Sequence, residues 1–344
     1  MSKKHDRAYL FCSLALFAAF LLSSALGSVT IPFSDLLKLT AVKLSGGHVE
    51  GQMLTYSTIL FELRFPRTIL IALTGAALSI SGSAYQGLFR NPLADPYLIG
   101  VASGAGLGAV LAMSLQITTH LNGLFIVPLA AFCSALITVW LVYSMARSGS
   151  TLPTTNLILA GVATSSFAAA LTSFLMLFTT DEFKRALVWL LGGATMSGWQ
   201  PVIVIIPYLM IGMGTLLAMG HALNVLQFGD EQAQQLGLPV ERVRRIIIMA
   251  ASLTTAAAVS FSGIIGFVGL IVPHLVRLLW GSDYRRLLPL SMLSGAVLLL
   301  LADILARLIL PPQEIPVGII TALAGAPFFL WVLRRTRPET QGAN

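Results

Sequence analysis

Ionisable side chains within apolar segments mark ion pathways and proton relays in membrane proteins. Asp303 is the one carboxylate deep in an apolar stretch of this chain, within LLADILARL (300–308), and Arg307 follows four residues later. On a helix these two side chains share a face and neutralise each other. The spacing therefore favours a structural ion pair over a proton relay, and it makes ion-coupled transport the weaker alternative.

The residues that usually build catalytic, metal or nucleotide sites are scattered in this sequence. The five histidines stand far apart: His5, His48, His120, His221 and His274. The sequence has no HExxH pair and no GxxxxGK[ST] phosphate-binding loop. Cys12 and Cys133 lie in separate apolar stretches, where cysteine behaves as a small hydrophobic residue. We therefore predict no catalytic residue, no metal site and no cofactor, and any ATP that drives this protein must bind to another polypeptide.

One charged stretch, 228–245 (FGDEQAQQLGLPVERVRR), separates two strongly apolar segments. The polar residues over 230–235 favour a short helix, Gly237 stands where a glycine commonly ends a helix, and Pro239 prevents continuation. Such a helix is either an ordinary loop helix or a contact for a soluble partner. The stretch alone does not decide between the two interpretations.

The elements that carry these residues are membrane spans. The chain has 344 residues, 56% hydrophobic and 10% charged, which is not a soluble globular composition. A helix of about 20 apolar residues crosses the hydrocarbon core. Ten such blocks occur, at 8–28, 66–86, 95–115, 124–146, 154–179, 199–220, 244–262, 264–280, 288–309 and 315–334. We predict an all-α membrane protein, one compact bundle forming a single domain (1–344), although the glycine-rich 260–273 could instead be a loop that dips into the membrane.

Topology explains the net charge of +7 better than a nucleic-acid partner does, and we expect no nucleic acid to bind. With ten spans and a cytoplasmic N-terminus, seven of the 21 Lys and Arg fall outside: Lys38, Lys43, Arg64, Arg67, Lys184, Arg185 and Arg307. The other fourteen fall inside, in agreement with the positive-inside rule. We therefore predict that both termini and the stretch 228–245 are cytoplasmic. The N-terminal apolar run is long for a signal peptide, which favours an uncleaved first helix.

Two further patterns describe the rest of the bundle. The outer segments 29–63 and 180–198 are each expected to hold a short helix on the outer surface. Small residues recur every four positions in two spans, at Gly75, Ser79 and Ser83 and at Gly100, Gly104 and Gly108. Such stripes let transmembrane helices approach closely, so we interpret them as packing surfaces rather than functional sites.

Seven segments together resemble one family of membrane proteins. They are LRFPRT (63–68), GSAYQGLFRNPLADPYLIGVASGAG (82–106), TNLILAG (155–161), FGDEQAQQLGLPV (228–240), GFVGLIVPHLVRLLWGSDYRRLLP (266–289), LLADILARL (300–308) and EIPVGIITALAGAPFFLWVL (314–333). In this order they are similar to the permeases of binding-protein-dependent ABC importers for iron–siderophores, haem and cobalamin, the FecCD or type II importer family. The stretch from LLADILARL to GAPFFLWVL reads much like the cobalamin branch.

The resemblance implies a homodimer of ten-helix subunits in the plasma (inner) membrane of a bacterium or archaeon, surrounded by the lipid bilayer. Two copies of a separate cytoplasmic ABC ATPase dock below it, and an extracytoplasmic solute-binding protein delivers cargo from above. Segment 228–240 is similar to the coupling helix that fits into a cleft of the ATPase, which favours the partner contact. The coupling residues are Gly229, Asp230, Glu231, Gln232, Ala233, Gln234, Gln235, Leu236 and Gly237.

The resemblance also assigns roles to three arginines. Arg64 and Arg67 in LRFPRT, and Arg307 in ADILARL, match outer-face arginines that engage acidic residues of the binding protein. We expect them to form a rigid charged rim that carboxylates recognise. The alternative is that they anchor the helix ends at the membrane interface, with Arg307 paired to Asp303.

Four residues match positions near the family's cytoplasmic gate. They are Asn91 and Leu93 in RNPLAD, and Thr154 and Thr155 before NLILAG. Because Asn91 precedes Pro92, the helix is expected to break there. Broken backbone at membrane depth is tolerated where it lines a cavity or is buried in protein. A simple helix-capping role for Asn91 is the alternative.

Together these expectations describe the transmembrane subunit of an ATP-driven importer of a metal chelate, working by alternating access. An ion-coupled secondary transporter without an ATPase is the alternative, and a purely structural membrane subunit is a third. For the cargo we favour an iron complex, because the resemblance makes that the commonest substrate class, and cobalamin is the close second choice.

Overall fold

The computed structural model describes residues 2–27, 31–47, 49–115, 125–149, 152–178, 182–193 and 198–335. Each of the ten predicted spans corresponds to one helix. These are α1 (Ser2–Ala25), α4 (Phe65–Leu88), α5 (Val101–Ser114), α6 (Ile126–Ala146), α7 (Thr154–Leu177), α9 (Trp199–Ala218), α12 (Val240–Ser262), α13 (Val268–Trp280), α14 (Tyr284–Leu308) and α15 (Val317–Arg335). Within the described ranges, seven helices are long and apolar enough to cross a membrane, and α5, α13 and α15 contribute shorter apolar segments. His48 and His120 lie outside the described residues.

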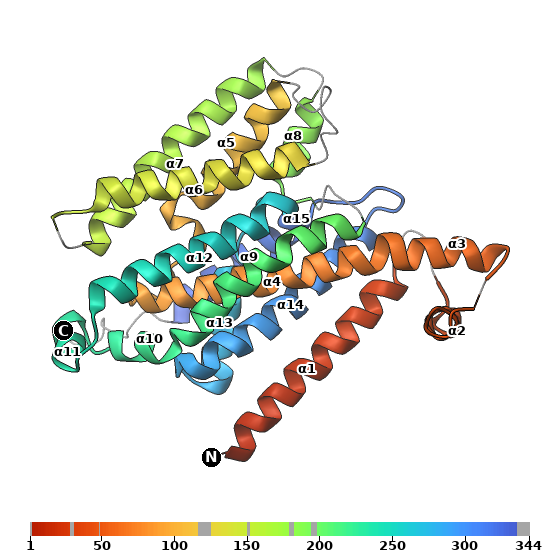
Figure 1. Ribbon diagram of the computed structural model, residues 1–344, viewed down its shortest axis with the longest axis horizontal. Helices are drawn as coiled ribbons and strands as arrows, with labels where there is room; N and C mark the ends of the chain where they lie inside the picture. The colour runs from red at the N-terminus through yellow and green to blue at the C-terminus, as the bar shows by residue number, and fades with distance from the viewer. Residues whose placement is uncertain are drawn as a thin grey trace, which may run out of the picture.

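Shorter helices cap the two ends of the bundle. One end carries α2 (Phe33–Leu44), α3 (Gln52–Thr58) and α8 (Phe183–Leu190), which confirms a short helix in each of the two predicted outer segments. The opposite end carries α10 (Gly220–Leu226) and α11 (Asp230–Gln235), and the first turn of α1 lies toward this end (Figure 1). We call these the α2 end and the α11 end.

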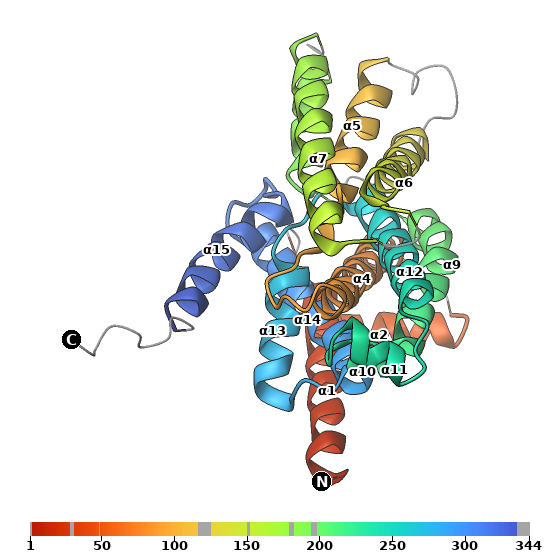
Figure 2. The same cartoon turned by 90° about the vertical axis from the view of Figure 1, so that its left-hand side faces the viewer.

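Helix α4 lies at the centre of the bundle. In its most apolar window 83% of the residues are buried, against 22% for α7 and 28% for α1. Seen along the bundle, α12, α13 and α14 surround α4, whereas α7 and α15 lie at the periphery (Figure 2). A membrane helix that buries little of its apolar surface within the subunit presents the rest to lipid or to another subunit.

Small residues allow the central helices to approach closely. A Cβ added to Gly75 would overlap the carbonyl group of Gly295 on α14, and one added to Gly82 would overlap that of Gly269 on α13. Gly104 and Gly108 have the same relation to α6. The small-residue stripes are therefore packing surfaces, as predicted, because no larger side chain fits at these contacts.

Two predicted spans contain breaks. The span at 95–115 is interrupted: a short 3₁₀ helix, η2 (Pro96–Ile99), ends at Gly100 in the left-handed region (φ 84°), and α5 begins only at Val101. Between α12 and α13, residues 263–267 are non-helical. The Tyr97 hydroxyl donates to the carbonyl oxygen of Ile265 at 2.8 Å, so side chains satisfy backbone groups that the broken helix leaves free.

One helix is much longer than the others. Residues Gln52–Leu88 are continuous over 37 residues, comprising α3, the π-helical segment η1 (Ile59–Arg64) and α4. A π-segment accommodates an additional residue and leaves backbone groups without their usual partners. The indole Nε1 of Trp199 donates to the carbonyl oxygen of Phe61 at 2.9 Å, which satisfies one of them.

Candidate functional sites at the two ends of the bundle

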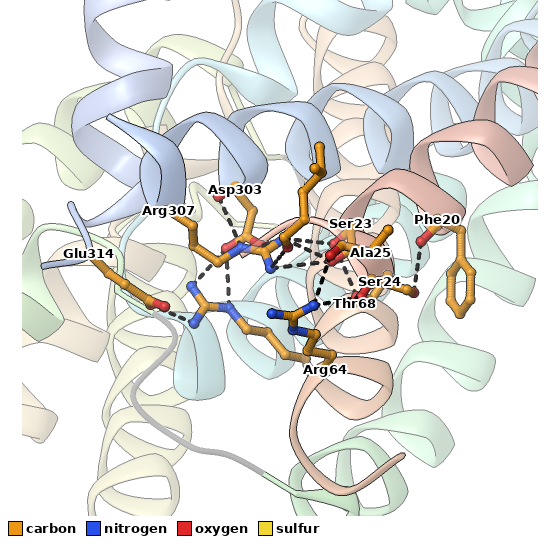
Figure 3. Close-up of polar contacts among 11 residues, drawn as sticks. Phe20, Ser23, Ser24, Ala25, Arg64, Thr68, Asp303, Arg307 and Glu314 are labelled. Carbon is orange, nitrogen blue, oxygen red and sulfur yellow. Dashed lines mark hydrogen bonds and ion pairs between the residues drawn. The ribbon is translucent and has the colours of Figure 1, made fainter. Parts of the chain in front are cut away.

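The three arginines predicted for docking lie together at the α2 end. Arg64 ends η1, Arg67 is in the first turn of α4, and Arg307 is in the last turn of α14. Figure 3 shows Arg64 and Arg307 beside Asp303 and the end of α1. Hydrogen bonds to Asp303 and Glu314 place Arg67 in the same cluster. The packing of α4 on α14 brings Arg67 and Arg307 to one place although they are far apart in the sequence.

Asp303 is the counter-charge at the centre of this cluster. Its side chain is fully buried, and Oδ2 lies 3.0 Å from the Nη2 of Arg307, which confirms the predicted i,i+4 pair. Arg67 also donates to Oδ1 of Asp303, from Nη2 at 2.9 Å and from Nε at 3.3 Å. A carboxylate that already pairs with two arginines has the geometry of a structural ion cluster, which argues against a proton relay at this position.

Backbone carbonyl groups of α1 complete the cluster. Arg64 donates to the carbonyl oxygens of Ser24 at 3.0 Å and Ala25 at 2.9 Å. Arg307 donates to the carbonyl oxygen of Leu26 at 2.9 Å and to the hydroxyl of Ser23 at 2.9 Å. These carbonyls are at the C-terminal end of a helix, where the dipole is negative and where basic side chains are stabilised.

The expectation of a solvent-facing rim of three arginines is wrong for two of them. The side chains of Arg64 and Arg307 are only 7% and 5% exposed, because both are directed into the backbone of α1. Arg67 is 22% exposed and pairs with Glu314 at 2.6 Å, whose side chain is 42% exposed. The surface charge of the cluster is therefore the Arg67–Glu314 pair.

The short helix α11 confirms the predicted course of the chain at the opposite end. It covers Asp230–Gln235, and the amide groups of Gly237 and Leu238 donate back to the carbonyls of Gln234 and Ala233. This is a Schellman ending with Gly237 in the left-handed region (φ 83°). Pro239 precedes the first residue of α12.

Helix α11 presents a mixed polar and apolar surface. Ala233 is buried and holds α11 on the bundle, while Glu231 and the three glutamines are exposed. Phe228 and Leu236, one on either side of α11, are 68% and 66% exposed. These two side chains add apolar surface on both sides of the polar helix at this end of the bundle.

Asp230 connects α11 to two other parts of the chain. Its Oδ2 accepts from Nη2 of the buried Arg244 on α12 at 2.8 Å, and its Oδ1 lies 4.0 Å from Nη2 of Arg90. Arg244 in turn donates from Nη1 to the carbonyl oxygen of Leu152 at 3.1 Å and to Glu241 at 2.9 Å. Arg244 therefore joins α11 to the segment that leads into α7.

The predicted gate residues occupy two segments at the α11 end. Asn91 and Leu93 lie in the turn after α4, where Oδ1 of Asn91 accepts from the amide of Leu93 at 2.9 Å. Thr154 and Thr155 form the first turn of α7, with Thr155 exposed. The helix break at Asn91 is as predicted, because α4 ends at Leu88.

A cavity of 640 Å³ opens beside the first gate segment. It is lined by Gln86, Arg90, Pro92, Asn224, Gln227, Phe228, Arg277, Ser282, Asp283 and Tyr284. The hydrogen bonds from Arg285 hold the pKa of Asp283 well below its usual range, so this carboxylate is ionised. It also accepts from Nδ2 of Asn224 at 2.6 Å, which fixes α10 against the start of α14.

Sequence reasoning missed several residues that these sites require. Glu314 was part of a motif, EIPVG, but its pairing with Arg67 depends on how the loop before α15 folds back. From the sequence, Arg90 and Arg244 enter only as positive charges that indicate topology, and their bonds to Asp230 could not be seen. A signal for Arg244 was available, since Glu241 precedes it by three residues on a predicted helix.

The fold and the two sites define a class. Seven helices long and apolar enough to span a membrane, with a buried ion cluster at one end of the bundle and a polar helix at the other, are typical of an integral membrane transport subunit. Comparison with known proteins identifies this subunit as a permease of the ABC importer type. The chain belongs to the FecCD transport family, which matches residues 15–335.

Relatives of known name cover most of the chain. The cobalamin import permease BtuC of Halobacterium salinarum is 47% identical over 280 residues, 81% of this chain and 74% of the relative. The ferric dicitrate permease FecD of Escherichia coli is 37% identical over 328 residues, covering 95% and 98%. A solved structure of an inward-facing metal-chelate type ABC transporter superposes with a TM-score of 0.81 at 29% identity, covering 96% of this chain and 99% of that one.

Proposed function

We propose that this permease acts as a homodimer in the plasma membrane, each copy a single domain over 1–344, with both termini and α11 in the cytoplasm. Two copies of a separate ATPase supply the energy by hydrolysing ATP, and an extracytoplasmic binding protein supplies the cargo. The observation that carries the proposal is α11, a polar helix with exposed apolar neighbours that is tied to both predicted gate segments. Ion-coupled transport has no comparable support, because Asp303 is already neutralised by two arginines.

The coupling contact is proposed to be the outward surface of α11. Residues 229–237 would enter the ATPase cleft with Phe228 and Leu236 as apolar anchors. Closure of the ATPase pair would then move α11 and, through Asp230, the gate residues Asn91 and Leu93 and the threonines at 154 and 155. Repetition of this cycle exposes the path alternately to the two sides of the membrane.

The docking contact is proposed to be at the α2 end. A carboxylate of the binding protein would meet Arg67, while Arg64 and Arg307 hold the end of α1 and keep the site positively charged. Three arginines and two carboxylates leave the cluster with a net positive charge, which favours an acidic partner. Charges at the edge of an interface act chiefly on the association rate and its salt dependence.

The cargo is proposed to be a metal chelate. The relatives transport cobalamin and ferric dicitrate, both of them chelated metals, and the identity to the cobalamin permease is the higher of the two. We therefore propose cobalamin as the first cargo to test, with a ferric chelate as the competing one. Uptake of labelled cobalamin and of a labelled ferric siderophore by a strain that lacks this gene and by the complemented strain decides between them.

Co-purification tests the coupling contact. Phe228→Ser with Leu236→Ser removes both apolar anchors but leaves the buried residues of the stretch in place. Loss of such interface anchors costs about 2 kcal/mol or more, so the affinity of the permease for the ATPase should fall about thirtyfold and less ATPase should be recovered with it. A matched control is Phe183→Ser with Leu187→Ser on α8, which are also exposed but at the α2 end. Undiminished recovery with the α11 variant, or an equal loss with the α8 variant, refutes the assignment.

Cysteine accessibility tests the orientation. With Cys12 and Cys133 replaced by serine, a single cysteine at Gln234 should react with a membrane-impermeant maleimide only in inverted vesicles. A cysteine at Lys38 on α2 should react only in right-side-out cells. The opposite pattern would reverse the proposed topology.

A further inference from the structure

The C-terminal end of α4 contains an unusual residue. The amide of Arg90 donates to the carbonyl of Gly87, and the amide of Asn91 donates to the carbonyl of Gln86, which together form a Schellman motif. Arg90 occupies the left-handed position of this motif, with φ 50°. A side chain is disfavoured there, and glycine is the usual residue.

Among the described residues the same motif ends three other helices, and each of them has glycine at the left-handed position. Gly46 ends α2, Gly192 ends α8 and Gly237 ends α11, with φ values of 69°, 78° and 83°. The turn after α4 therefore has an arginine where the fold prefers glycine. Backbone strain of this kind persists only where the surrounding structure compensates for it, and it clusters at functional sites.

The Arg90 side chain extends from the gate turn to the start of α11. Its Nη2 lies 4.0 Å from Oδ1 of Asp230, and its Nη1 would be 3.4 Å from a Cβ built on Gly229. Gly229 precedes the first residue of α11, and Asn91, a proposed gate residue, directly follows Arg90. A glycine at position 90 would suit the turn but would remove this connection.

The Arg90–Asp230 ion pair is too exposed to add much to the stability of the fold. The side chains of Arg90 and Asp230 are 49% and 42% exposed, and ion pairs in contact with water stabilise a fold little. The other arginine on Asp230 differs, because Arg244 is 6% exposed and also binds the Leu152 carbonyl. Asp230 is thus joined to the α7 gate segment by a buried arginine and to the α4 gate segment by an exposed one.

We propose that Arg90 is a positioning residue that transmits movement of α11 to the Asn91–Leu93 gate segment. This inference rests on the proposed coupling role of α11 and the proposed gate. Arg244 connects α11 to the other gate segment, at Thr154 and Thr155, and that connection is independent of Arg90. The two gate segments therefore have separate connections to one carboxylate.

The test is nucleotide-dependent crosslinking between the two copies of the permease, in the complex with its ATPase in lipid nanodiscs. On a background with Cys12→Ser and Cys133→Ser, either Leu93→Cys or Thr155→Cys reports one gate segment. Crosslinking is compared without nucleotide and with ATP plus vanadate, which holds the ATPase as an ADP–vanadate complex after ATP has been hydrolysed. Arg90→Gly should reduce the nucleotide dependence at Leu93 by at least about fivefold, the low end of ordinary coupling between sites, and should leave that at Thr155 unchanged.

Further variants separate a connecting role from a structural one. Arg90→Gly should retain ATPase association and thermal stability, because glycine suits the turn. Arg90→Lys should restore most of the response at Leu93, since the positive charge is kept. The matched control is Arg147→Gly, which removes an exposed arginine after α6 and should change neither reporter.

Each outcome of these experiments either supports or overturns the inference about Arg90. An unchanged response at Leu93 in Arg90→Gly overturns the inference while the proposed function stands. Loss of ATPase association in Arg90→Gly, or a lysine variant as unresponsive as the glycine variant, also overturns it. If neither reporter responds to nucleotide in the unaltered chain, the proposed gate fails and the inference fails with it.

Discussion

Asp303→Asn is the sharpest test of how the α2 end is held together. Asparagine keeps the shape of the side chain but removes the charge that faces Arg67 and Arg307. Removing one partner of a buried ion pair costs about 3–5 kcal/mol. Arg67 is partly exposed and keeps Glu314 at 2.6 Å, so the loss falls mainly on Arg307, which is 5% exposed.

We therefore expect the lower end of that range, about 3 kcal/mol, which changes the folding equilibrium more than a hundredfold. The assay is reversible unfolding in mixed micelles, followed by the fluorescence of the tryptophans, of which Trp189 is buried. Glu314→Gln is the matched control, because it removes the exposed carboxylate from the same Arg67 and should cost less than about 1 kcal/mol.

A double-mutant cycle locates the effect. Asp303→Asn and Arg307→Gln should each be costly alone, and the double variant should be less destabilised than the sum of the two. If Asp303→Asn costs no more than Glu314→Gln, or if the two substitutions in the cycle are additive, the buried pair does not stabilise this end and the reasoning is refuted.

Three other predictions concern packing and the two ends. Gly82→Ala should lower the free energy of unfolding by about 1–3 kcal/mol, because the added methyl group overpacks the contact with α13. Gly214→Ala should leave it unchanged or raise it by up to about 1 kcal/mol, because a Cβ at this helical position meets open space. Thermal denaturation in detergent compares the two variants. Arg244→Gln should accelerate amide hydrogen exchange in α11 but not in α4, because it removes the ion pairs that hold α11; equal exchange would contradict this. Trp199→Phe should lower the free energy of unfolding by about 1 kcal/mol, because the carbonyl group of Phe61 loses its hydrogen-bond donor. An unchanged unfolding midpoint would show that water replaces the indole as the donor.

The spans and the short helices could be predicted because their signals are local. Twenty apolar residues in a row, or a glycine and a proline after a polar helix, have one ordinary structural outcome. The interruption of the third predicted span was within reach of the same reasoning, since Pro96 and Gly100 stand inside it. The length of the apolar run predicts a span that starts at residue 95, whereas α5 starts only at Val101.

The surroundings of the arginines could not be predicted, because they depend on contacts between distant segments. Arg307 and Ser23 are 284 positions apart, and the carbonyls at the end of α1 carry no sequence signal of their own. An arginine near a helix end looks the same in the sequence whether it faces solvent or the backbone of another helix. The family resemblance draws attention to these arginines, and the packing of α1 on α14 determines where they are directed.

The continuous helix Gln52–Leu88 determines how far this protein reaches from the bilayer. At 1.5 Å per residue its 37 residues extend about 55 Å, whereas the hydrocarbon core is about 30 Å thick. Trp199, an aromatic residue of the kind enriched at the membrane interface, contacts this helix at Phe61. The turns before Phe61, together with α2, therefore stand in or beyond the layer of lipid headgroups. A molecule that approaches the bundle from that side therefore meets α2 and α3 before it reaches the hydrocarbon core.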